Sequence, residues 1–326
     1  MHRRLVVPAS LRQVAAAQEG LVSSGQCHEH GLTKQNVAAL VGRQDWDRVA
    51  RGVFDTGVAG GTTDPFDLPR RRSALVGVLA RPGSVATGLC ALVWQGVQGA
   101  PAAITPEVTF PDGSPRSGGP GRVRRDRLRR WVVVGGLPCV PGELALAQAV
   151  PELDRGHAVA LMDSARHRRV VTEDEFRRAR EAARGRRGAA GAAPWWDESD
   201  PRAESPIETA ARIACTDAHC SPDALQLVVR DARGRFLARV DLAWLLPGGR
   251  VLLLELDGRD AHTTPEALFG DRYRQNGLTS HGAVLLRFTG RDVARGVAVD
   301  EVRRVLAGAG WSPHPWPADQ AFVLLT

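Results

Sequence analysis

The hydrophobic pattern is clearest between residues 204 and 310, where short apolar stretches alternate with turn residues. The segments LQLVVRD, ARGRFLARVDLAWLL and GRVLLLELDG have the length and composition of β-strands, and turn residues at 231–234 and 247–249 separate them. Another strand, AVLLRFT, is expected after a helix at about 265–280, and a last helix is expected near 297–307. The pattern therefore predicts a mixed α/β unit.

A helix is expected to open this unit, in the segment SPIETAARIACTDA. Ser205 can cap it, Pro206 suits its first position, and Glu208 stands where a capping box places an acid. Glu208 thus has a structural reason to be there, and a role in a site is the competing interpretation.

The beginning of the chain favours two helices followed by a short strand. Ser10 can cap a helix through about residue 24, and after a Gly/His-rich turn Thr33 can cap a second helix, KQNVAALVG. A β-branched stretch follows near 51–56. This is the order of a winged helix-turn-helix, and an ordinary helical hairpin packed on another element is the alternative. The candidate DNA-contacting side chains of a winged helix are Lys34, Gln35, Arg43, Arg48 and Arg51.

A middle α/β region is expected at 72–184, with a loop that is rich in arginine. The arginines of this loop form either a solvated face or a nucleic-acid contact; they are Arg116, Arg122, Arg124, Arg125, Arg127, Arg129 and Arg130. A helix capped by Thr172 closes the region. The Gly/Ala/Pro-rich stretch 185–203 is then expected to be a linker, and 311–326 an irregular tail.

The length and the net charge of the chain indicate its size class and the kind of partner it binds. The chain has 326 residues, 43% of them hydrophobic, which suits a globular protein of about two or three domains. Its net charge of +7 favours polyanions such as nucleic acid. No apolar run is long enough to cross a membrane and the start has no signal-peptide pattern, so a cytoplasmic protein without a membrane partner is expected. The five scattered cysteines favour buried free thiols over disulfides or zinc.

The most informative stretch is LLLELDGRDAH at 252–262, because a strongly apolar strand ends there in several acids and a histidine. A hairpin centred on Gly248 places Asp241 directly opposite Glu255, with Cβ atoms about 5 Å apart. Asp257 then faces Arg239 and can pair with it, whereas Asp241 and Glu255 find no cation in the two strands. Mg²⁺ or Mn²⁺ bound by Asp241 and Glu255 would relieve their repulsion. A solvated acidic strand end is the alternative.

The series SPIE, ARVDLAW, LLLELDG, DAH, GDRYRQNGL and VLLRFT resembles the very-short-patch-repair-like branch of the PD-(D/E)XK nucleases over about residues 204–306. The resemblance implies a restriction-endonuclease-like mixed sheet flanked by helices. It also implies metal-dependent phosphodiester hydrolysis, with Glu208, Asp241 and Glu255 as acids and His262 as an assisting base or acid. The lysine of the superfamily is replaced by Asp257, so His262 or Arg287 would have to supply its role.

The preceding residues resemble AbiEi-type antitoxins. LTKQNVAAL with RVARGVF matches their winged-helix start, and VVVGGLPCVPGELALAQAV with AVALMDSARHRRVVTEDEF matches the region that follows. Together the two resemblances predict an α/β protein, α+β overall, with a winged helix-turn-helix at 1–60, a middle region at 72–184 and a nuclease-like domain at 204–310. The expected function is Mg²⁺-dependent cleavage of DNA in repair or defence. The alternative is a non-catalytic regulator or antitoxin of a type IV toxin-antitoxin system, which binds its own operator or a partner toxin.

Overall fold

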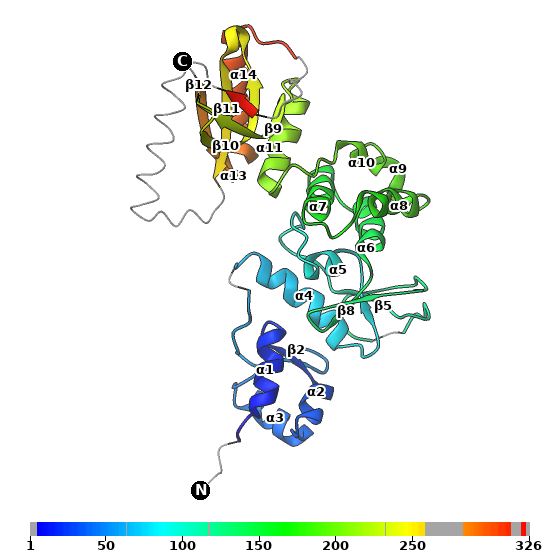
Figure 1. Ribbon diagram of the computed structural model, residues 1–326. Coiled ribbons are helices and arrows are strands. Elements are labelled where there is room, and N and C mark those ends of the chain that lie inside the picture. The colour runs from blue at the N-terminus through cyan, green and yellow to red at the C-terminus, as the bar shows by residue number, and fades with distance from the viewer. Residues whose placement is uncertain are drawn as a thin grey trace. The chain divides into compact units, whose positions relative to one another are not determined.

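The computed structural model describes residues 5–62, 64–116, 118–231, 233–257 and 283–313, and the backbone of 321–323. The chain forms two compact units, Met1–Glu198 and Ser199–Thr326. Both combine helices with sheets, as Figure 1 shows, so the expected α/β class is confirmed. Among the helices of the described ranges, none has the length and apolarity needed to cross a membrane.

The first unit begins with three helices and a three-stranded antiparallel sheet of order β1-β3-β2. These elements are α1 (Ala9–Ala17), β1 (Leu21–Ser23), α2 (Ser24–Glu29), α3 (Lys34–Gly42), β2 (Asp47–Ala50) and β3 (Val53–Asp55). Their core contains Leu11, Val37, Leu40, Trp46 and Phe54, all buried. The apolar faces of α1 and α3 therefore pack together with the sheet.

Two details of this region differ from expectation. Thr33 caps α3 as predicted, through a capping box with Asn36, but α1 begins after Pro8 and the Ser10 hydroxyl contacts His30 Nδ1 instead. The first helix also ends at Ala17 rather than near residue 24. Glu19 and Gly20 have positive φ angles, which an α-helix does not tolerate, and the chain turns there into β1.

The middle of the first unit holds a second sheet, of order β6-β5-β4-β8-β7. Its strands are β4 (Val85–Ala86), β5 (Glu107–Thr109), β6 (Arg122–Arg124), β7 (Val132–Val134) and β8 (Leu137–Cys139). The accompanying helices are α4 (Asp67–Leu79), α5 (Gly88–Trp94), α6 (Gly142–Ala149), the short η1 (Val150–Glu152), α7 (Arg155–His167) and α8 (Glu173–Ala183). Thr172 caps α8 with Glu175 as its reciprocal partner, as expected.

The arginine-rich loop is not uniformly a solvated face. Arg124 is only 6% exposed, and its guanidinium pairs with Glu107 at 2.8 Å and with Glu152 at 3.0 Å. Arg122 pairs with Glu152 at 2.8 Å. Arg124 is therefore buried in an ion-pair network that the exposed Arg122 joins, because β6 places both residues beside acids of β5 and η1.

The stretch expected to be a linker is largely folded. Residues 189–192 and 195–198 form the short helices α9 (Ala189–Ala192) and α10 (Trp195–Glu198) of the first unit. Trp196 is buried, its ring lies 5.2 Å from that of Phe176, and Arg180 pairs with Asp197 at 2.6 Å. An aromatic anchor thus holds a Gly/Ala-rich segment whose composition alone resembles a linker, and the two units divide between Glu198 and Ser199.

The second unit is a five-stranded mixed sheet of order β12-β11-β10-β9-β13. It comprises α11 (Pro206–Asp217), β9 (Ala224–Arg230), β10 (Phe236–Leu245), the short η2 (Pro247–Gly249), β11 (Val251–Asp257), β12 (Ala283–Thr289), α13 (Gly290–Ala294), α14 (Val297–Ala309) and β13 (Ala321–Val323). The central strands β9, β10 and β11 are antiparallel, while β12 and β13 run parallel to their neighbours.

Alternate residues of the strands supply two cores. Trp244, Leu252 and Leu254 pack with Ala211 of α11 and Val302 of α14, and Figure 1 shows these helices beside the sheet. Another cluster contains Leu227, Val229, Val240, Val251 and Leu253. The sheet is thus buried on both faces, as runs of apolar residues in β10 and β11 predict.

The expected irregular tail contains one element, because β13 pairs in parallel with β9. The helix expected at about 265–280 lies outside the described residues.

Candidate functional site

The paired strands β10 and β11 separate at the acids singled out in the sequence. The backbone residue pairs between the two strands run from Leu245–Val251 to Leu242–Leu254. This is the register expected from a hairpin centred on Gly248. Beyond it, the Asp241 carboxylate Oδ2 accepts the backbone N–H of Leu256 at 2.7 Å. The Asp241 side chain thus bonds to the backbone of β11 just beyond the last residue pair of the two strands. Asp241 therefore lies beside the segment that contains Glu255, as predicted.

Glu208 joins this site from the first turn of α11. Ser205 caps the helix and Pro206 occupies its first position, as the sequence indicates. The Glu208 carboxylate accepts the Ser205 hydroxyl at 2.6 Å and the Glu204 backbone N–H at 2.9 Å. Its capping contacts fix the side chain, which is only 8% exposed, so the structural and functional interpretations of Glu208 are compatible.

Gln226 of β9 links the two acids and was not predicted. Its Nε2 donates to Glu208 Oε2 at 2.8 Å and lies 3.3 Å from Asp241 Oδ1. The residue has a φ of 53°, unusual for a non-glycine residue inside a strand. Strained backbone of this kind is concentrated at functional sites, and here it accompanies an amide that bridges two carboxylates.

The charge of Asp241 is destabilised by its surroundings. Burial raises the pKa of its carboxyl, the Leu256 N–H and the Gln226 amide lower it, and the charges of Glu208 and Glu255 raise it further, to about 6. The Asp241 carboxyl is therefore close enough to those of Glu208 and Glu255 to be repelled by both. Such mutual repulsion is what a bound cation or a proton relieves.

Glu255 has a cationic neighbour that the hairpin alone could not supply. In the parallel pairing of β11 with β12 it stands opposite Arg287, whose Nε donates to Glu255 Oε2 at 2.8 Å. The expectation concerned only the two strands of the hairpin, and this cation comes from the neighbouring strand β12. Arg287, a candidate to replace the missing lysine, is thereby placed within the acidic site.

The predicted pair of Asp257 with Arg239 is not formed. Arg239 makes two 2.7 Å hydrogen bonds to the Glu204 carboxylate, and its backbone pairs with Val228. Asp257 is exposed at the end of β11, opposite Thr289 of β12. The two residues part because β10 and β11 are no longer paired at this point.

The oxygen atoms of Asp241 and Glu255 are suitable ligands for a hard divalent cation. Carboxylate oxygens of Asp241 and Glu255 are the ligands that Mg²⁺ and Mn²⁺ prefer. Over the described ranges, no group of three or more His, Cys, Asp or Glu side chains is arranged so that it could hold a metal ion by itself. Water and a phosphate oxygen would have to complete the coordination, as is usual for Mg²⁺. His262 lies outside the described residues.

The candidate DNA-contacting residues lie in the first unit, and all are exposed: Lys34, Gln35, Arg43, Arg48 and Arg51. The first two open α3, Arg48 lies on β2, and Arg51 forms the turn between β2 and β3. Arg43 is 3.8 Å from Asp45, and Arg48 lies over the Phe54 ring at 5.8 Å.

No family model matches the chain. Two similar proteins are both uncharacterized proteins of Mycobacterium tuberculosis, from strains CDC 1551 / Oshkosh and ATCC 25618 / H37Rv. Each is 30% identical over 178 residues, which is 55% of this chain and 60% of the relative.

Proposed function

We propose that the second unit is a Mg²⁺- or Mn²⁺-dependent endonuclease that hydrolyses DNA phosphodiesters, and that the first unit binds DNA. The observation that carries the proposal is the convergence of Glu208, Asp241 and Glu255 from three different elements, with a raised pKa at Asp241. A group of mutually repelling, partly buried acids costs stability. A bound cation or a proton would relieve the repulsion that Asp241 experiences from Glu208 and Glu255.

Asp241 and Glu255 would hold the metal ion. When bound, Mg²⁺ supplies charge neutralisation at a phosphate oxygen and activation of water. Glu208 supports the site through Gln226, which donates to Glu208 and lies near Asp241. Each of these acids is already positioned by hydrogen bonds from the fold, so little rearrangement is needed to bind a cation.

Arg287 and His262 are the candidates for the role of the missing lysine. The Arg287 guanidinium lies at the acidic site, bonded to Glu255, and can stabilise negative charge on a phosphate. His262 is proposed as the general base or acid on the basis of the family resemblance.

The proposal that the first unit binds DNA follows from its element order. The order α1-β1-α2-α3-β2-β3, with an antiparallel sheet, is that of a winged helix-turn-helix. In such a domain α3 enters the major groove with Lys34 and Gln35, and the turn between β2 and β3 brings Arg51 to the phosphate backbone. The net charge of +7 adds a favourable field, and a cytoplasmic location follows from a DNA substrate.

A non-catalytic regulator or antitoxin is the second candidate. It is favoured by Asp257, an exposed acid where nucleases of this superfamily place a lysine, and by the Arg287–Glu255 pair, which already neutralises one acid without a metal. In this case the chain would bind its own operator, or a partner toxin, without cleaving DNA.

The endonuclease and the non-catalytic regulator differ in whether they produce cleaved DNA. Incubation of the full chain with supercoiled plasmid and Mg²⁺ or Mn²⁺ should yield nicked or linear DNA that is absent when EDTA is added. Intact plasmid with retained DNA binding would favour the regulator.

A further inference from the structure

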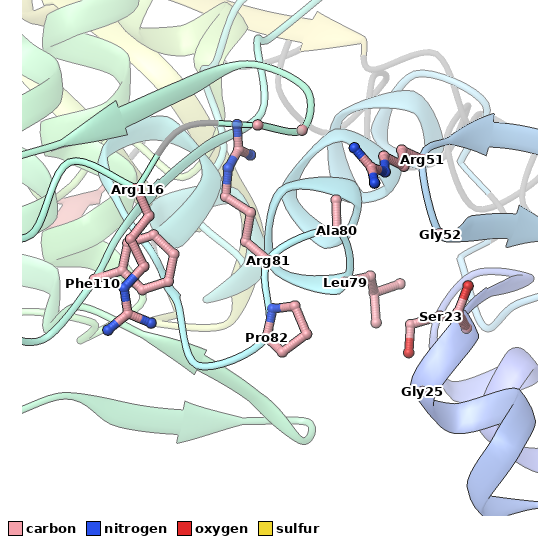
Figure 2. Close-up of a pocket in the computed structure, with 13 residues that line it drawn as sticks. Ser23, Gly25, Arg51, Gly52, Leu79, Ala80, Arg81, Pro82, Phe110 and Arg116 are labelled. Carbon is pink, nitrogen blue, oxygen red and sulfur yellow. The ribbon is translucent and has the colours of Figure 1, made fainter.

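The first unit contains a pocket of about 460 Å³ whose walls are unusually rich in arginine. It is lined by the junction of β1 and α2, the β2–β3 turn, the end of α4 and the loop near Gly118 and Gly119. Arg51, Arg81 and Arg116 are among the lining residues, and Figure 2 shows them around the pocket. The described residues that line it include no aspartate or glutamate. The pocket thus has a strongly positive lining and lies in the size range of small-molecule sites.

Arg81 is the most informative of these residues, because its charge is buried. The residue is 7% exposed, and its Nη1 donates to the Pro120 carbonyl at 2.6 Å. Its buried Nε has no hydrogen-bond partner, and within the described ranges no carboxylate pairs with it. Burial also lowers the pKa of its guanidinium. A buried guanidinium without an anion is costly, and a bound anion would remove that cost.

The glycine loop keeps this guanidinium at the wall of the pocket. Gly119 has a φ of 88°, and a Cβ atom on it would lie 3.1 Å from Arg81 Cζ. Gly118 also has a positive φ, of 97°. A side chain at either position would have a strained backbone, and a side chain at Gly119 would also crowd Arg81.

The other two arginines are more accessible. Arg51 is exposed at the β2–β3 turn. Arg116 is 3.3 Å from Asp112 and lies 4.4 Å above the Phe110 ring, so part of its charge is already engaged. The lining also includes the apolar side chains of Leu79, Ala80 and Pro82, next to Arg81 in the chain. The pocket therefore offers charge for an anionic group and an apolar surface for the body of a ligand.

We propose that this pocket binds a small phosphate monoester of about mononucleotide size, with Arg81 as its anchor. A phosphate monoester carries about −1.5 to −2 charges, which matches several arginines better than a monoanion does, and its oxygens suit the planar guanidinium. A small molecule is favoured over duplex DNA because Arg81 is buried within the concave surface, out of reach of a broad backbone. The proposal is independent of catalysis in the second unit.

Calorimetric titration of the full chain with AMP, inorganic phosphate and adenosine tests the proposal. AMP should bind, phosphate should bind more weakly, and adenosine should give no heat. Arg81→Met should weaken AMP binding at least about tenfold, the loss expected for one charge-assisted contact. Arg187→Met, which removes an exposed arginine outside the pocket, should leave it unchanged. Absence of heat with both AMP and phosphate, equal binding by Arg81→Met, or an equal loss in Arg187→Met would overturn the proposal.

A second measurement keeps the test decisive if Arg81→Met does not fold. Hydrogen exchange of the wild-type chain should show that AMP protects peptides covering 79–82 and 118–121 and that adenosine does not. Unchanged exchange at saturating AMP would contradict the assignment. Protection of the same peptides by a short DNA duplex and not by AMP would also overturn it and would assign the pocket to DNA.

Discussion

Asp241 Oδ2 accepts the backbone N–H of Leu256 at 2.7 Å, just beyond the last recorded pair of the β10–β11 ladder. A carboxylate thereby accepts a hydrogen bond from the neighbouring strand. This contact holds Asp241 in place without neutralising its charge, since the partner is an amide and not a cation. The candidate metal site depends on this arrangement.

The pH dependence of stability should reveal Asp241. Its pKa is about 6 in the folded chain and about 3.9 when unfolded. A raised carboxyl pKa means that the folded state binds the proton more tightly, so this group favours folding below about pH 4 and costs stability as pH rises towards 6. Above pH 7 the cost levels at up to about 3 kcal/mol, at about 1.4 kcal/mol per pKa unit.

Asp241→Asn should remove that cost. Urea unfolding between pH 4.5 and 8 should show the variant gaining stability relative to wild type as pH rises, with the difference constant above about pH 7. A difference that does not vary with pH would show that Asp241 titrates normally.

Divalent cations should stabilise the second unit. Mn²⁺ that binds only the folded state at 100 times its Kd adds about 2.7 kcal/mol, which a thermal melt detects. The increase in Tm should be lost in Asp241→Asn and in Glu255→Gln, while Asp300→Asn, on α14, should retain it. An equal increase in all four proteins would place the cation elsewhere.

Arg287 should contribute to the free energy of unfolding, apart from any role in catalysis. It bonds to Glu255 at 2.8 Å, and Glu255 is 8% exposed. Arg287→Met leaves this carboxylate buried without its cation and should cost about 2 kcal/mol, whereas Arg250→Met, at an exposed position, should cost little. Mn²⁺ should restore part of the loss by replacing the guanidinium, and denaturant curves with and without Mn²⁺ measure both effects. Equal stabilities of the two variants would contradict a supporting role for Arg287.

Gln226 should moderate the repulsion between Glu208 and Asp241. Gln226→Met removes the amide donor at nearly constant volume, so the pKa of Asp241 should rise above about 6 and the loss of stability should be larger at pH 8 than at pH 5. The same substitution in an Asp241→Asn background should lose that pH dependence, which a double-mutant cycle measures. A pH-independent coupling would mean that Gln226 acts only through packing.

The first unit should bind DNA through ionic contacts. Lys34→Gln and Arg48→Gln should each weaken binding and reduce the slope of log K against log salt by about 0.9, as expected when one phosphate contact is lost. Arg168→Gln, exposed after α7, is the matched control. Fluorescence anisotropy with a labelled duplex at several salt concentrations gives the slopes, and unchanged slopes in both variants would exclude α3 and β2 from the interface.

Much of the acidic site follows from the sequence, because a tight turn fixes the register of a hairpin. The turn at Gly248 correctly gave the β10–β11 pairing, and the Ser205–Pro206 start of α11 placed Glu208 correctly. Both predictions depend only on residues that are close together in the sequence.

The rest of the site depends on features that no local pattern fixes. The β9–β10 register shifts between Phe236 and Ala238, so the turn at 231–234 does not reveal that Gln226 reaches Asp241. The Glu255–Arg287 pair depends on a parallel strand that follows a long connection, where no turn sets the register. Trp196 shows the same limit in the first unit, since only its tertiary packing reveals that the Gly/Ala-rich segment is folded.

Metal-dependent nicking of supercoiled plasmid by the wild-type chain, Asp241→Asn and Glu255→Gln tests the proposed nuclease most directly. Wild type should produce nicked DNA with Mg²⁺ or Mn²⁺, and both variants should lose at least about 100-fold in rate, the scale expected when transition-state charge stabilisation is removed, while still shifting DNA on a gel. Intact plasmid with wild type in every metal condition, together with a retained gel shift, would contradict the nuclease and favour a DNA-binding regulator.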